Sequence, residues 1–391
     1  MSLDFGIEIE LLLAPHPNAQ PNFLATLTRM GWDKTIEGQL RAGRVSNGYM
    51  LDNLQNRNRR ALRSAVAEAL SDADIPASSD CSSEYDVWSV IDDESLDEFP
   101  GYWRVELVSR VLSADNDWHI EIDEVFRILR QNCQIRLTSS SSLHVHISPG
   151  RNTFNDMQIR SLGKAVIYYD DAITRIMPAE RKPNPYAKSN CLPEGKGNSG
   201  GQSVNPKIKL LYSQVPAKTF EPLFKALDKV TWRTVCGMMQ ETKGNVARYV
   251  SWNFENITKP CGTLEFRRPP GVDSPARARH WVAFALGFVS RATSDPAYWE
   301  AAKTRNHGGS VAELKTFVTG GLQRFPLHCA AALLKIEEDT SKPLILSAEE
   351  QLHIEELKAR KARTASPFAS KASSRANSPS VGRSDSGGWG R

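Results

Sequence analysis

The sequence predicts an α+β fold in which an antiparallel or mixed sheet presents one face to a cleft and packs helices behind the other face. Strand-like runs are interrupted by segments with helical periodicity, which is typical of mixed folds. Four of the strand-like runs also alternate polar and apolar residues, and side chains two positions apart share one face of a strand. Each of these strands is therefore expected to have one polar and one apolar face.

The polar faces of the four runs carry carboxylates, imidazoles and a guanidinium. If the strands are neighbours, these groups converge on one patch whose composition suits metal ions and phosphate. Taken singly, each pair also fits the solvated face of an edge strand. The residues are Glu8 and Glu10 in FGIEIELLL, Glu106 in YWRVELVS, His144 and His146 in SLHVHIS, and Glu265 and Arg267 in TLEFRRP.

The remaining elements follow from the same periodicity. Residues such as Leu62, Val66 and Leu70 recur at helical spacing, as do Ile122 and Val125 further along. Strands are predicted at about 4–12, 86–92, 102–109, 135–148, 247–254 and 263–268, and helices at about 54–73, 121–133, 155–176 and, for the most part, 275–363.

The chain is expected to form one folded domain over residues 1–363. The irregular stretch 183–206 is predicted to be a flexible loop, either a functional lid or a disordered insertion. Residues 364–391 are rich in Ser, Gly and Arg and poor in aliphatic residues, and we expect a disordered tail.

Composition and charge exclude several classes of protein. The apolar runs are too short for a membrane span of roughly 20 residues, and the N-terminus does not resemble a signal peptide. The six cysteines form no CxxC pair or dense framework, which favours free thiols in the cytoplasm. Residues 358–391 hold eight Lys or Arg against one Asp, so their +7 leaves −3 of the whole-chain +4 for the remainder. Nucleic acid is therefore not an expected partner, although the basic run KARKAR (358–363) leaves a nuclear address as an alternative.

These motifs, in this order, resemble the putative amidoligase family, which belongs with glutamine synthetase and the glutamate–cysteine ligases among carboxylate–amine ligases. The resemblance spans roughly residues 5–290. Weaker similarity lies in DDESL (92–96) and in residues 181–186. The motifs that carry it are FGIEIE (5–10), VELVS (105–109), SLHVHIS (142–148), RYVSWNF (248–254) and GTLEFR (262–267).

The resemblance implies a glutamine synthetase-like catalytic domain with a curved sheet lining the active site. ATP would phosphorylate a substrate carboxylate, and an amine would then displace phosphate to form an amide. By similarity, one Mg²⁺ (or Mn²⁺) would bind Glu8, His144 and Glu265, and a second would bind Glu10 and Glu106. His146, Asn253 and Arg267 would contact the nucleotide or substrate, and Arg267 and Arg248 would act on the transferred phosphoryl group.

Two other interpretations stay open at this point. His144 and His146 form the HxH pattern of some zinc hydrolases, although the other histidines lie in unrelated contexts. The chain can also be an inactive ligase-fold adaptor that acts through its basic tail. Residues 195–201 are glycine-rich but lack the GxxxxGK[ST] pattern of a P-loop. The sequence identifies neither the carboxylate nor the amine substrate, which can be small molecules, peptides or proteins, and it leaves the oligomeric state undetermined.

Overall fold

The structure is a computed structural model that describes residues 2–35, 48–82, 84–150, 152–191, 205–240, 249–340 and 352, without the side chains of 48–54. The chain divides into two compact units, Met1–Leu344 and Ile345–Arg391. All the helices and strands named below lie in the first unit, and of the second unit the structure describes Leu352 alone. The predicted tail, 364–391, lies outside the described residues.

The first unit is built on a sheet in which nine strands are described, in the order β2-β3-β4-β1-β7-β9-β8, with β5 and β6 also pairing with β1. All of these pairs are antiparallel except β2 with β3. The predicted α+β class with an antiparallel or mixed sheet is thereby confirmed. The strands are β1 (Asp4–Pro15), β2 (Ala77–Ser78), β3 (Trp88–Ile91), β4 (Trp103–Val108), β5 (Leu112–Ser113), β6 (Cys133–Arg136), β7 (Leu143–Ser148), β8 (Trp252–Asn253) and β9 (Leu264–Phe266).

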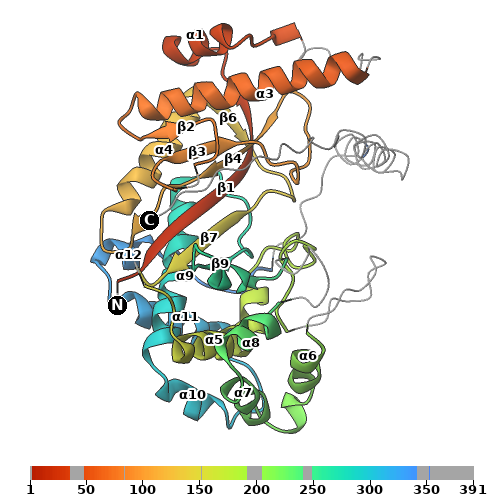
Figure 1. The fold of residues 1–391 in the computed structure, drawn as a ribbon, viewed down its shortest axis with the longest axis vertical. Coiled ribbons are helices and arrows are strands. Elements are labelled where there is room, and N and C mark those ends of the chain that lie inside the picture. The colour runs from red at the N-terminus through yellow and green to blue at the C-terminus, as the bar shows by residue number, and fades with distance from the viewer. Residues whose placement is uncertain are drawn as a thin grey trace, which may run out of the picture. The chain divides into compact units, whose positions relative to one another are not determined.

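The long strand β1 lies at the centre of the sheet between β4 and β7 (Figure 1). Its register places Glu8 opposite His144 on β7 and Glu10 opposite Glu106 on β4. The next pair, β7 with β9, sets His146 opposite Glu265. Directly opposed residues on one face of a sheet have Cβ atoms about 4.5–5.5 Å apart, so the pairing alone makes the polar residues neighbours.

Helices cover the sheet and extend the first unit beyond it (Figure 1). Helix α3 packs on β2 and β3 and carries α1, whereas α9 packs on β7, α4, α5 and α11. The helices are α1 (Pro21–Arg29), α3 (Gly48–Ser71), α4 (Trp118–Asn132), α5 (Asp156–Arg175), α6 (Pro206–Ser213), α7 (Glu221–Asp228), α8 (Trp232–Met238), α9 (Pro275–Ser294), α10 (Ala297–Ala302), α11 (Val311–Leu322) and α12 (Leu327–Ala332), with short 3₁₀ turns η1 (Val215–Ala217) and η3 (Glu255–Thr258).

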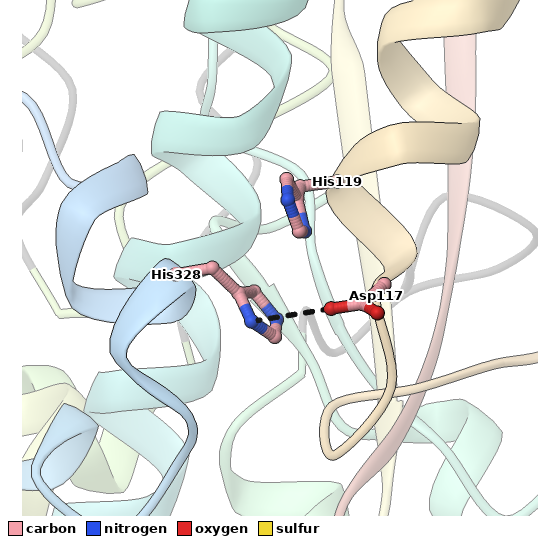
Figure 2. A group of neighbouring side chains, drawn as sticks. All are labelled: Asp117, His119 and His328. Atoms are coloured by element: carbon pink, nitrogen blue, oxygen red, sulfur yellow. Dashed lines mark ion pairs between the residues drawn. The ribbon is translucent and has the colours of Figure 1, made fainter.

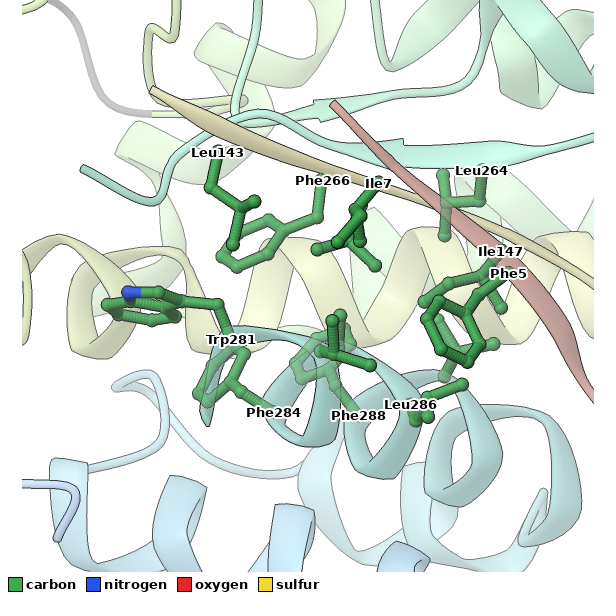
Figure 3. Packing of buried hydrophobic residues seen from close by; sticks show 14 of the residues in the cluster. Phe5, Ile7, Leu143, Ile147, Leu264, Phe266, Trp281, Phe284, Leu286 and Phe288 are labelled. Carbon is green, nitrogen blue, oxygen red and sulfur yellow. The ribbon is translucent and has the colours of Figure 1, made fainter. Parts of the chain in front are cut away.

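The apolar faces of the central strands pack directly on α9 (Figure 3). Phe266 of β9 stacks on Trp252 of β8 at a ring-centroid distance of 4.2 Å and on Phe284 of α9 at 5.5 Å. Trp252 in turn stacks on Phe288 at 4.7 Å. Burial of these aromatic rings contributes strongly to the free energy of folding and fixes the position of the strands relative to α9. The opposite face of the same strands carries the polar side chains and does not pack on α9.

Most of the predicted elements are present, with shifted ends. Helix α5 begins where Asn155 and Gln158 form a capping box, close to the predicted start. Within the predicted helical stretch 275–363, helices α9 to α12 lie between Pro275 and Ala332, residues 333–340 have no regular structure, and residues 341–351 and 353–363 lie outside the described residues. In the predicted loop 183–206, residues 192–204 lie outside the described residues, and α6 begins at Pro206. No helix in the described part of the chain is long and apolar enough to cross a membrane.

Candidate active site

A polar pocket of about 340 Å³ lies against the polar face of the sheet. We call it the acidic pocket and define it by the six acidic and histidine residues of β1, β4, β7 and β9 that line it. Strand alternation explains the set, since each of these side chains stands next to an apolar residue that faces the core on the other side of the sheet. The six residues are Glu8, Glu10, Glu106, His144, His146 and Glu265.

Glu8, His144 and Glu265 form the tightest cluster in this pocket. One ligand atom from each lies within 4.8 Å of the other two. Nδ1 of His144 is 2.7 Å from Oε2 of Glu8 and 3.7 Å from Oε1 of Glu265. Ligands on opposite sides of a Mg²⁺ ion are about 4 Å apart, because each bond is about 2.1 Å long. The donor atoms therefore fit around one divalent ion after a small side-chain movement.

His146 completes a charged network around Glu8. Its Nε2 is 3.1 Å from Oε1 of Glu8, and its Nδ1 is 3.2 Å from Oγ1 of Thr263. Burial lowers the pKa of His146, but the carboxylates of Glu8 and Glu265 outweigh burial and raise this pKa to about 9. Burial likewise raises the pKa of Glu8, yet the two imidazoles bring it well below its ordinary value. Near neutral pH, His146 is therefore an imidazolium and Glu8 is a carboxylate.

Glu10 and Glu106 form a second pair of carboxylates at the β1–β4 junction. Burial is the main cause that raises the pKa of Glu10, and it raises that of Glu106 to about 9 with help from the charges of Glu8 and Glu10. Ser142 donates a hydrogen bond to Oε2 of Glu10, and its Oγ is 2.9 Å from Nε2 of His144. Two carboxylates that resist ionising together are stabilised by a shared cation, which is the usual arrangement of a metal site.

Glu265 is held in place by three donors. Arg267 donates from Nη1 to Oε1, and Nδ2 of Asn253 donates to Oε2 at 2.7 Å. Asn256 adds a longer bond to Oε2 at 3.3 Å. Burial raises the pKa of Glu265, but Arg267 and His146 outweigh it and lower this pKa below its ordinary value. Asn253 is thus engaged with Glu265, and its oxygen accepts from Gln240.

The guanidinium of Arg267 borders the same pocket from the end of β9. Its Nε donates to the carbonyl of Tyr186 at 3.4 Å, and its carbon lies 5.9 Å from the ring centre of Tyr249. Two further arginines fasten residues 181–188 to this strand end: Arg181 donates to the carbonyls of Arg267 and Arg268, and Arg268 donates to those of Lys182 and Ala187.

The structure brings eight of the nine predicted site residues to this pocket: the six of the acidic pocket, Asn253 and Arg267. The ninth, Arg248, lies outside the described residues. Ser142, Asn256 and Lys259 also line the pocket and were not named as site residues. Ser142 stands two positions before His144 in SLHVHIS, whereas Asn256 and Lys259 lie in or next to a 3₁₀ turn without an alternating pattern. Arg181 lines it too, and its only signal was the weak family similarity at 181–186.

Comparisons with known proteins bear on this site. Residues 1–191 match the model of a family described as "Putative amidoligase enzyme". No curated protein matches the chain. Among solved structures, the crystal structure of a bifunctional glutathione synthetase from Pasteurella multocida is similar at 12% identity and a TM-score of 0.28, over 95% of this chain and 46% of that chain. This chain therefore spans less than half the length of that synthetase, and the predicted glutamine synthetase-like fold stays a prediction. Over residues 1–191, the chain matches the putative amidoligases, and this match supports the family predicted from the motifs.

Proposed function

We propose that this protein is an ATP-dependent ligase that joins a carboxylate to an amine through an acyl phosphate. The observation that carries the proposal is the cluster of Glu8, His144 and Glu265, whose ligand atoms lie within 4.8 Å of one another although they come from three separate strands. The cluster lies in a polar pocket large enough for phosphate groups. The match of residues 1–191 to the amidoligases supports the same activity.

The donor set fits divalent cations of the Mg²⁺ and Mn²⁺ class. Carboxylate oxygens are the ligands that Mg²⁺ prefers, and one imidazole among them also suits Mn²⁺. We assign Glu8, His144 and Glu265 to one ion and Glu10 and Glu106 to a second. When bound, such ions neutralise the phosphate charges of ATP and of the acyl phosphate.

The cationic side chains at the pocket are suited to phosphate as well. His146 carries a proton near neutral pH, because its pKa is raised to about 9. Arg267 offers a planar fork of donors, a geometry that Lys does not reproduce. In the proposed reaction these two residues bind the transferred phosphoryl group. Asn253 and Asn256 orient Glu265 rather than bind substrate, because both amides donate to its Oε2. We assign Arg248 to phosphate binding on the family resemblance alone.

The reaction is tested by screening pairs of carboxylates and amines for ADP release in the presence of Mg²⁺. We expect substrate-dependent ADP release from the wild type and a loss of at least 100-fold in Glu265→Gln, because one metal ligand is then neutral. The matched control is Glu300→Gln, which changes an exposed glutamate on α10 that pairs with Lys303.

Three results would contradict the proposal. Equal activity of wild type and Glu265→Gln would remove the metal assignment. Failure of the wild type to bind ATP with Mg²⁺ would favour an inactive adaptor. Stoichiometric zinc at His144 and His146, with hydrolysis instead of ADP release, would favour a metal-dependent hydrolase.

The two proposed ion sites differ in what they serve. If the ion on Glu10 and Glu106 lies nearer the acceptor carboxylate, Glu106→Gln lowers the rate of ADP release more than it weakens ATP binding. An equal loss of ATP binding and of turnover would contradict this division.

The six cysteines are free thiols, which suits an enzyme of the cytoplasm.

A further inference from the structure

A second group of metal-ligating side chains lies on helices α4 and α12. Asp117 and His119 stand at the start of α4, and His328 stands on α12, more than 200 residues later in the chain. One ligand atom from each of the three lies within 4.8 Å of the others. Figure 2 shows the two imidazole rings facing each other with Asp117 beside His328. None of the three lines the acidic pocket.

We call Asp117, His119 and His328 the histidine cluster. Their side chains are too far apart to hydrogen-bond one another, but close enough to share one ion. Nδ1 of His328 is 3.8 Å from Oδ1 of Asp117, which is beyond a hydrogen bond. The imidazole rings stack with centres 4.4 Å apart. One ligand atom from each of the three residues lies within 4.8 Å of the others, whereas ligands of one tetrahedral Zn²⁺ ion lie about 3.3 Å apart, because each bond is about 2.0–2.1 Å long. The side chain of Asp117 is 75% exposed and is therefore free to make the remaining movement.

Two ring nitrogens in the cluster are buried and have no hydrogen-bond partner in the described part of the chain: Nδ1 of His119 and Nε2 of His328. The backbone of Asn116 hydrogen-bonds the His328 ring, and since Nε2 has no partner, that bond involves Nδ1. A backbone bond at one ring nitrogen leaves a lone pair on the other, which is the usual state of a metal-bound histidine. The indole of Trp118 lies against both rings, at 6.3 and 5.8 Å, and forms an apolar wall.

We propose that Asp117, His119 and His328 bind one zinc ion, with water as the fourth ligand, and that this ion joins α12 to the start of α4. Two neutral imidazoles and one carboxylate favour Zn²⁺ and neighbouring transition metals over Mg²⁺ and Ca²⁺. The ion closes a loop of more than 200 residues, and constraints on long loops restrict the unfolded chain most strongly. The proposal does not depend on the activity of the acidic pocket.

The first test counts zinc ions bound to the full-length protein by equilibrium dialysis with excess Mg²⁺ present to compete at the acidic pocket. We expect the wild type to bind one zinc ion more than Asp117→Asn or His328→Gln. The matched control is His307→Gln, which changes an exposed histidine elsewhere and keeps the wild-type number. Glu8→Gln also keeps the zinc of the histidine cluster, which separates it from any zinc in the acidic pocket.

The second test measures thermal unfolding as zinc is added. An ion that binds only the folded state raises the melting temperature progressively with its concentration. We expect this rise in the wild type and in His307→Gln, and its loss in Asp117→Asn. Because the Asp117 side chain is exposed, its replacement should leave the melting temperature without zinc unchanged, so that only the loss of binding is seen. The proposal is overturned if the wild type, Asp117→Asn and His328→Gln bind the same number of zinc ions, or if zinc shifts the melting temperature of Asp117→Asn as much as that of the wild type.

Discussion

The protonated carboxyl of Glu106 has consequences for stability. Its pKa in the folded protein is raised to about 9 from an ordinary value of 4.5, first by burial and then by the charges of Glu8 and Glu10. Between these two pH values the folded state holds a proton that the unfolded state has released. The free energy of unfolding therefore falls as pH rises through this window. The site residue destabilises the metal-free fold at the pH where an enzyme works, as is common for functional groups.

Glu106→Gln should remove this penalty. With metal removed by a chelator, we expect the variant to exceed the wild type in unfolding free energy by on the order of 1–2 kcal/mol at pH 8, because glutamine is neutral and takes up no proton on folding. The difference should shrink toward pH 5, because the carboxyl of the unfolded state also begins to bind a proton near its ordinary pKa of 4.5. Urea denaturation at several pH values checks it, with Glu300→Gln as the control. A difference that does not change with pH would contradict the pKa assignment.

Metal binding should release the proton that Glu106 holds in the metal-free protein. An ion held by Glu10 and Glu106 displaces the proton of Glu106, so binding is expected to release protons and to strengthen as pH rises toward 9. Titration calorimetry in buffers of different ionisation enthalpy measures the number released. We expect Glu106→Gln to release fewer protons than the wild type at pH 7. Equal release by both proteins would mean that the second ion does not bind at Glu106.

Arg267 is the residue whose geometry matters most to the proposed chemistry. Its guanidinium faces the pocket while Nη1 is bonded to Glu265. Arg267→Lys keeps the positive charge but loses the planar fork, so we expect ADP release to fall by about 100-fold or more with little change in unfolding free energy. Kinetics of the variant beside its melting curve check this. Unchanged turnover in Arg267→Lys would show that charge alone suffices at this position.

At the scale of elements, the crossing of α9 and α11 depends on two glycines. A Cβ placed on Gly321 would lie 1.9 Å from the carbonyl oxygen of Gly287, and one on Gly287 would lie 2.5 Å from that of Val318. Neither backbone oxygen can move away cheaply, because each belongs to a helix. The adjacent Gly320 has its nearest neighbour, Arg291, at 3.9 Å. Since α9 carries the apolar faces of β7 and β9, this crossing supports the strands of the acidic pocket.

Two neighbouring substitutions separate packing from helix propensity. We expect Gly321→Ala to lower the free energy of unfolding by about 3 kcal/mol, because the added methyl group forces the helices apart. Gly320→Ala should raise it by about 0.5–1 kcal/mol, because alanine favours the helix and finds open space. Denaturation midpoints of both variants measure the contrast. A similar effect of both substitutions would mean that α11 is free to shift on α9.

Element prediction succeeded where periodicity was strong and failed where packing decides the outcome. The alternation in FGIEIELLL places Glu8 and Glu10 on one face whatever the tertiary context, so this part of the site could be predicted. β8 is only two residues long, and its place beside β9 depends on the stacking of Trp252 on Phe266. Ser142 shares a face with His144, but its contact with Glu10 arises only from the register that sets β7 beside β1.

For the whole molecule, the family match and the site have different extents. The match ends at residue 191, and this part supplies Glu8, Glu10, Glu106, His144 and His146. The last ligand of the proposed first ion, Glu265, belongs to β9, which pairs with β7. Motif similarity predicted that Glu265 belongs with the others, but only the strand order shows that β9 lies next to β7, between β7 and β8.

The family match ends before β9, and this predicts how fragments of the chain behave. A fragment of residues 1–191 exposes the apolar faces of β1 and β7, because β9 and the aromatic layer of α9 are missing. We expect it to aggregate or to unfold without cooperativity, and to bind no ATP with Mg²⁺. Residues 1–344 contain the whole first compact unit and its core, so this fragment should unfold at the temperature of the full chain. Calorimetry of the three proteins, with and without Mg²⁺ and ATP, measures both effects. Cooperative unfolding of 1–191 would show that the matched half is a domain in its own right and that Glu265 is an addition to a site already formed.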